Sequence, residues 1–153
     1  MKTLFICLLL MIAMVNCSTP NKDKNVSGKD NLSGVSNNLT EIYWKLTELN
    51  GKGVSHYPAQ NNEPYILLKK DGNIVEGTGG CNGMGGKFTL DGDHKIAFSQ
   101  MMSTEMACPD MMLETDFHRA LEKIKAYDSN GHILTLLGEG NTPIAKFQAS
   151  KRK

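Results

Sequence analysis

Gly77-Thr78-Gly79-Gly80-Cys81-Asn82-Gly83-Met84-Gly85-Gly86 is the most glycine-rich stretch of this 153-residue chain, and it carries a cysteine in its middle. A second short segment, Ser103-Thr104-Glu105-Met106-Ala107-Cys108, supplies another cysteine. Glycine accepts positive φ angles and lets neighbouring backbones approach closely. The first stretch therefore predicts a tight turn in which backbone geometry positions Cys81.

The chain on either side of these segments has the turn signals of an antiparallel sheet. Asp71-Gly72, Asp91-Gly92 and Asn130-Gly131 each separate two strand-like segments. Such pairs fit the positive φ angles of two-residue hairpin loops, so we predict three hairpins. Upstream, apolar residues from Ile42 to Leu46 alternate with polar ones, which predicts a half-buried first strand with Trp44 as a core anchor.

One segment has helical rather than strand periodicity. Leu113, Phe117, Leu121 and Ile124 recur on one helical face, which predicts a helix from about Asp110 to Lys125. The expected fold is therefore mainly β, a small antiparallel barrel-like curled sheet of roughly seven or eight strands with one α-helix. We expect the helix to plug one end of the barrel or to cover an open edge.

The N-terminus resembles an export signal. A short basic lead, Met1-Lys2-Thr3, precedes an apolar run from Leu4 to Val15 that ends at Asn16-Cys17. The run suits a secretory signal and is shorter than the ~20 residues of a transmembrane helix. Residues 1–16 are thus a predicted signal peptide and Cys17 a predicted lipidation site. An ordinary cleaved signal or an uncleaved anchor is the alternative, although no Ala-x-Ala-like cleavage site follows.

Composition divides the remaining chain into three parts. Residues 17–40 are rich in Ser, Asn, Lys, Asp and Gly and predict a lipidated flexible tether. Residues 41–149 predict one folded domain, and residues 150–153 a basic tail. Because Ser18, rather than aspartate, follows Cys17, we expect lipid anchoring in the cell envelope, at the outer membrane. The formal net charge of +1 gives no electrostatic basis for binding nucleic acid.

The chain has four cysteines. Cys7 would leave with the signal and Cys17 would carry lipid, so Cys81 and Cys108 would mature as a pair in an oxidising compartment. We predict a disulfide between them, which would stabilise the domain by ~3–4 kcal/mol on the chain-entropy model. Two free thiols packed as small apolar groups are the alternative.

Catalytic and metal-binding patterns are incomplete. A nucleophilic Cys81 would need a base, yet His94 and His132 follow hairpin turns and His118 sits on the predicted helix. Zinc, phosphate-loop and serine-elbow patterns are not matched. We therefore predict no catalytic residues, no metal and no cofactor.

Five methionines flank Cys108 in the sequence. They could form a soft binding surface or adaptable filler between barrel and helix, and we favour the packing role. Asn82 is expected to accept a left-handed turn or to bond the local backbone. The methionines are Met101, Met102, Met106, Met111 and Met112.

Taken in order, these motifs resemble the META/HslJ domain family of envelope lipoproteins and related proteins. The resemblance covers nearly all of residues 41–148 and implies a compact, mostly antiparallel β fold with one helix. It implies no accepted catalytic activity. The motif residues are Trp44, Gly80, Cys81, Asn82, Gly86, Thr104, Met106, Ala107 and Cys108, followed by a helix that carries Glu114, Phe117 and Leu121.

The resemblance also gives the functional expectation. Family members are associated with envelope stress, heat stress or antibiotic tolerance. We expect a non-enzymatic, lipid-anchored envelope protein that binds a partner protein or a small ligand. The alternative is a thiol-dependent redox or enzymatic protein that uses Cys81 and Cys108.

Overall fold

A computed structural model describes residues 38–58, 60–92 and 94–152. The predicted signal peptide, the lipidation site Cys17 and the tether as far as residue 37 lie outside the described residues. Within the described ranges, none of the helices has the length and apolarity that a membrane crossing requires.

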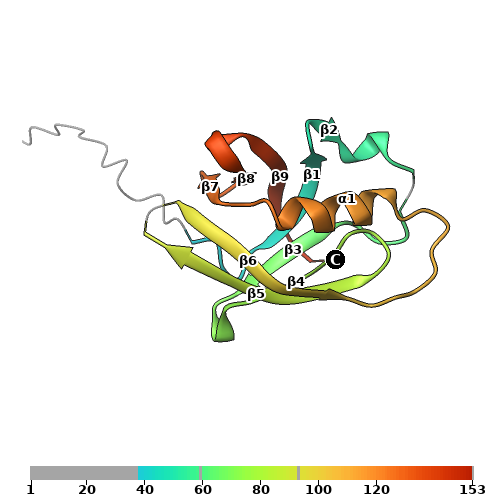
Figure 1. Cartoon of the computed structure of the whole chain (residues 1–153), viewed down its shortest axis with the longest axis horizontal. Coiled ribbons are helices and arrows are strands. Elements are labelled where there is room, and N and C mark those ends of the chain that lie inside the picture. Colours follow the sequence, from blue (N-terminus) through green and yellow to red (C-terminus); the bar gives the residue numbers. More distant parts are fainter. Residues whose placement is uncertain (1–37, 59, 93, 153) are drawn as a thin grey trace, which may run out of the picture. The chain divides into compact units, whose positions relative to one another are not determined.

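The domain is a closed antiparallel barrel, as predicted (Figure 1). Its strands are ordered β1-β3-β4-β5-β6-β7-β8-β9, and β9 pairs back onto β1 to close the sheet, while the short β2 extends the edge of β1. The elements are β1 (Tyr43–Leu49), β2 (Lys52–Gly53), β3 (Tyr65–Lys69), β4 (Ile74–Thr78), β5 (Gly83–Asp91), β6 (Lys95–Ser103), α1 (Met112–Leu121), β7 (Ala126–Ser129), β8 (Ile133–Leu137) and β9 (Pro143–Ser150).

All three predicted hairpins are present, but their loops are longer than the expected two residues. Only the glycine of each pair has a positive φ, at 67° for Gly72, 56° for Gly92 and 82° for Gly131. A two-residue type I′ loop needs positive φ at both positions. The paired residues that flank the three loops are Lys69 and Ile74, Asp91 and Lys95, and Ser129 and Leu134.

The glycine-rich stretch is not one tight turn, which corrects the sequence-based expectation. Strand β4 continues to Thr78 and β5 already begins at Gly83, so the connecting loop is Gly79–Asn82. Gly86 lies inside β5, where an added Cβ would come within 2.9 Å of the carbonyl oxygen of Ser99. Its role is thus close packing of β5 against β6.

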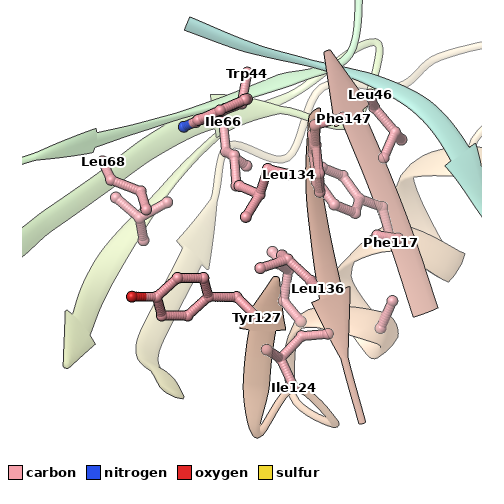
Figure 2. Close-up of a cluster of buried hydrophobic side chains, with 14 of the residues drawn as sticks. Trp44, Leu46, Ile66, Leu68, Phe117, Ile124, Tyr127, Leu134, Leu136 and Phe147 are labelled. Carbon is pink, nitrogen blue, oxygen red and sulfur yellow. The ribbon is translucent and has the colours of Figure 1, made fainter. Parts of the chain in front are cut away.

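The barrel interior is filled by one apolar cluster that contains the predicted anchor Trp44 (Figure 2). Trp44 is fully buried, and its indole N–H donates to the carbonyl oxygen of Leu39 over 2.9 Å. Leu39 is itself buried, although sequence analysis placed it in the tether. At the other end of the chain, Ser150 pairs with Tyr43 in the closing strand. The packed domain therefore extends beyond residues 41–149.

Helix α1 is shorter than predicted. Asp110 lies outside it, and its Oδ1 accepts a hydrogen bond from the Met112 amide over 3.0 Å. The buried face of the helix packs against the barrel, with the Phe117 and Phe147 ring centroids 6.0 Å apart (Figure 2). The helix ends at Leu121, and the chain turns into β7 through the buried Ile124. Because the chain must turn into β7 within these few residues, helix α1 cannot continue to Lys125.

Candidate functional site

Several of the family-motif residues meet at a polar clasp, which we define as Gly79–Asn82, Thr104, Met106 and Glu114. Its centre is the buried side chain of Asn82. The Asn82 Oδ1 accepts from the Thr104 hydroxyl at 2.8 Å and from the Met106 amide at 2.7 Å. Its Nδ2 donates to the Met106 carbonyl at 3.3 Å and to Glu114 Oε1 at 2.8 Å. The amide therefore uses both of its donor hydrogens and both acceptor positions.

Glu114 completes the clasp from helix α1. Only 3% of this residue is exposed. Its Oε2 accepts from the backbone amides of Cys81 at 3.2 Å and Asn82 at 2.6 Å. A buried carboxylate is costly unless hydrogen bonds replace its lost water, and here three donors do so. The clasp thus fixes the helix to the β4–β5 loop.

Glycine is required where this loop crosses the helix. A Cβ on Gly79 would lie 2.7 Å from the Cα of Glu114, which is closer than side chains tolerate. Gly80 has a φ of 127°, a region that L-residues rarely adopt. Its amide donates to the Thr78 hydroxyl over 3.0 Å. The two glycines therefore let the loop wrap closely around the Glu114 side chain.

The structure joins Cys81 and Cys108 as a disulfide. Their Cα atoms are 6.5 Å apart, and their separation in sequence is 27. The bridge ties the β4–β5 loop to the segment between β6 and α1. Cys81 is buried and Cys108 is half-buried. Ala107 lies exposed between the clasp residue Met106 and the bridge. The loop from Thr104 to Cys108 is consequently fixed at both ends.

Two features of the clasp were not anticipated from sequence. Asn82 does not adopt a left-handed conformation, and it bonds a segment 24 residues away rather than its local backbone. Glu114 was named only as a family residue on the predicted helix, with no role of its own. Its spacing to Phe117 and Leu121 already places it on the buried face of the helix, and this signal identifies it in retrospect.

The polar groups of the clasp are satisfied by hydrogen bonds to one another. Open hollows lie beside the clasp. One of them, which we call the β1 hollow, has a volume of about 710 Å³. It lies between strand β1 and the loop 54–64. Its lining mixes apolar, amide and charged groups: Lys45, Leu46, Thr47, Val54, Ser55, Tyr57, Pro58, Gln60, Asn61, Asn62, Glu63 and Pro64.

Two further hollows adjoin the same loop. One, of about 170 Å³, reaches the disulfide and is lined by Cys81 and Cys108 together with Gln60 and Asn61. The other, of about 420 Å³, contains the stacked rings of Tyr43 and Tyr65, whose centroids are 4.3 Å apart. Asn62 and Glu63 line both this hollow and the β1 hollow. Residues between positions 54 and 64 thus contribute to the lining of all three hollows.

The electrostatics of this face are balanced. Glu63 forms an ion pair with Lys45 at the edge of the β1 hollow. Burial raises the pKa of Tyr43 above its usual value, and the carboxylate of Glu63 adds to the rise. Burial and the nearby Asp116 likewise raise the pKa of Tyr57, which keeps both phenols protonated at neutral pH. The lining of the hollows therefore combines neutral hydrogen-bonding groups with the Lys45–Glu63 pair, Arg152 and Asp110.

The histidines that were considered as partners for a reactive cysteine lie in different settings. His94 packs on Tyr127 with ring centroids 5.5 Å apart, and His118 lies on α1 with its Nε2 buried and unbonded. Among described residues, the lining of the hollow beside the disulfide includes no histidine. No group of three or more His, Cys, Asp and Glu side chains with metal-binding geometry occurs in the described ranges either.

The predicted packing role of the methionine cluster is wrong for most of its members. Met102, Met106, Met111 and Met112 are exposed, whereas Met101 packs partly against the core. For Met106 the reason is that Asn82 holds its backbone on both sides, which leaves the side chain outside.

A family model described as "META domain" matches residues 37–151. The chain belongs to the META domain family. The matched region includes Leu39 and the last residues of β9, in agreement with the packing of both ends. None of the curated proteins matches the chain.

Solved structures share the fold of this META domain. An NMR structure of a protein from Burkholderia xenovorans superposes with a TM-score of 0.57 at 21% identity, covering 74% of this chain and 85% of that one. A crystal structure of a DUF4847-family protein from Bacteroides vulgatus gives a TM-score of 0.55 at 19% identity, covering 78% of this chain and 100% of that one. At these identities the likeness concerns the fold alone.

Proposed function

We propose that this META-domain protein is a non-enzymatic, lipid-anchored envelope protein that binds another envelope component through the β1 hollow. The observation that carries the proposal is the contrast between a fully bonded clasp and an open hollow of about 710 Å³ beside it. Ligand sites are concave and mostly apolar, with a few polar groups that fix orientation. The lining of the β1 hollow has this composition.

The motif residues support binding rather than catalysis. Both oxygens of Glu114 and the whole amide of Asn82 are engaged within the clasp. The sulfurs of Cys81 and Cys108 are bonded to each other. A general acid, base or nucleophile must be able to contact substrate. These groups are instead hydrogen-bonded or disulfide-bonded to one another. We infer that the clasp positions the loop that forms the wall of the hollow.

The anchor rests on sequence alone. A lipid on Cys17 would hold the protein at the envelope surface, with the residues before the domain as spacer. We place its role in envelope homeostasis or stress because of the resemblance to envelope lipoproteins. Cells that carry the Cys17→Ala variant should lose label from a clickable fatty acid that marks the wild-type protein. Retention of the label on Cys17→Ala would contradict the proposed anchor.

The binding proposal is tested by photo-cross-linking in intact cells. A benzophenone amino acid is placed at position 61, which lines the β1 hollow, or at the exposed position 139 outside every described hollow. We expect a discrete cross-linked product from position 61 and none from position 139. Equal products from both positions, or none from position 61, would contradict binding at the hollow.

A further inference from the structure

The most unusual surface of the domain is made of methionine. Among described residues, the large hydrophobic side chains that stand out in solvent are Leu90, Ile133 and four methionines between Met102 and Met112. Met102 is 71% exposed, Met112 58%, Met106 54% and Met111 38%. We call these four the methionine surface. Single exposed apolar side chains are common on protein surfaces, but here four in one short segment carry an oxidisable thioether.

The outward orientation is fixed by the fold. The Met106 backbone is bound on both sides by Asn82, through its amide at 2.7 Å and its carbonyl at 3.3 Å. The adjacent Thr104 amide donates to the Gly83 carbonyl over 3.0 Å. The disulfide holds the chain again at Cys108. The thioether of Met106 therefore projects from a rigid segment.

Met84 provides the internal contrast. It faces the barrel interior and is 6% exposed. Its methyl group lies 3.0 Å from the position that a Cβ on Gly77 would occupy, which shows how tightly it is packed. An oxygen added to Met84 would have to enter this apolar cluster, whereas an oxygen added to Met106 would enter water. Sulfoxide formation disrupts a packed core but leaves an exposed side chain in place.

We propose that the methionine surface is a reversible oxidation site that consumes peroxides or hypohalous acids at the surface of the protein. In each event the thioether sulfur donates an electron pair to the oxidant. Hydrogen peroxide transfers one oxygen to sulfur and leaves as water, while hypochlorous acid adds the same oxygen and leaves as chloride and a proton. The sulfur becomes a sulfoxide, which a methionine sulfoxide reductase returns to the thioether with electrons from a dithiol.

The geometry predicts that the domain survives this chemistry. Oxidation of the methionine surface breaks none of the clasp hydrogen bonds, because Met106 takes part through its backbone only. The disulfide is already oxidised and does not compete as a thiol. The barrel core keeps its apolar contacts while Met84 is shielded. The proposal is independent of ligand binding at the β1 hollow.

The test uses the full-length protein, purified in detergent and titrated with dilute hypochlorous acid and, separately, hydrogen peroxide. Peptide mass spectrometry follows each methionine. We expect Met102, Met106 and Met112 to gain one oxygen about tenfold or more faster than Met84, since susceptibility follows exposure. The thermal midpoint should stay unchanged at this stage, and a methionine sulfoxide reductase should remove the oxygens.

Matched variants separate a reactive surface from general sensitivity. Met102→Leu/Met106→Leu/Met112→Leu should consume oxidant more slowly and expose Met84 to earlier oxidation, whereas Met84→Leu should consume it like the wild type. Equal rates at Met84 and Met106, unfolding that accompanies the first oxidations, or sulfoxides that the reductase does not reverse would each overturn the proposal.

Discussion

The clasp and the β1 hollow are neighbours with opposite character. In the clasp, Asn82 and Glu114 are buried and exchange hydrogen bonds with each other and with the adjoining backbone. In the β1 hollow, the exposed side chains of Ser55, Asn61 and Asn62 present hydroxyl and amide groups to open space. Several family-motif residues thus lie where the loop and the helix are joined, while the open hollow lies beside them. A motif can identify a fold without being the site of its function.

The largest expected effect comes from breaking the clasp at Glu114. Glu114→Ala leaves the Cys81 and Asn82 amides buried without an acceptor, at ~1–3 kcal/mol for each, so we expect a loss of about 4 kcal/mol in the free energy of unfolding. Urea denaturation of the oxidised protein measures this value. The control is Glu122→Ala, an exposed residue just past the same helix, which should change stability by less than ~0.5 kcal/mol. Equal losses in the two variants would contradict the role of Glu114.

Opening the disulfide should have the next largest effect. Cys81→Ser/Cys108→Ser removes a covalent closure across 27 positions and should cost ~3–4 kcal/mol on the chain-entropy model. Reductant should lower the urea midpoint of the wild type and leave that of the double variant unchanged. A wild-type protein that titrates two free thiols when purified without reductant would show that the bridge does not form.

Close approach of the loop to the helix predicts an intermediate effect. Gly79→Ala would place a methyl group 2.7 Å from the Glu114 Cα and should cost ~1–3 kcal/mol by overpacking. Gly83→Ala is the matched control, because nothing lies within 4 Å of an added Cβ there. Thermal unfolding of the two variants compares them directly. Equal midpoints would show that the loop moves freely relative to α1.

Filling the β1 hollow should have the smallest effect on stability and a large effect on binding. Ser55 is exposed at the hollow, so Ser55→Trp should change the free energy of unfolding by less than ~0.5 kcal/mol. The cross-linked product from position 61 should nevertheless fall severalfold. Glu139→Trp adds the same side chain elsewhere and should leave the product unchanged. A similar fall in both variants would contradict a site at the hollow.

Much of the barrel was predictable because its signals are local. Alternation around Trp44 identified the first strand, and the Asp-Gly and Asn-Gly pairs located the hairpins. Loop lengths were not predictable in this way, because strand register depends on partners that the local sequence does not show. The helix was recognised from its apolar spacing, but its end at Leu121 depends on how the chain must turn into β7.

The clasp was only partly predictable for a similar reason. The pairing of Cys81 and Cys108 was predicted by counting cysteines on the expectation of export, and the structure joins the two residues. The bonds of the Asn82 side chain reach across 22 to 32 positions, which no local pattern reveals. The methionine cluster was assigned to packing because methionine fills irregular gaps, whereas most of its side chains are exposed.

We infer that the Cys81–Cys108 disulfide stabilises the domain and propose that binding occurs at the β1 hollow. The most direct measurement is cross-linking from position 61 in the Cys81→Ser/Cys108→Ser protein, in intact cells at a temperature at which the variant is folded. We expect the double variant to give the same cross-linked product as the wild type, at similar yield, although its free energy of unfolding is lower. Loss of that product from a folded variant would contradict the account and indicate that the cysteines themselves perform the function.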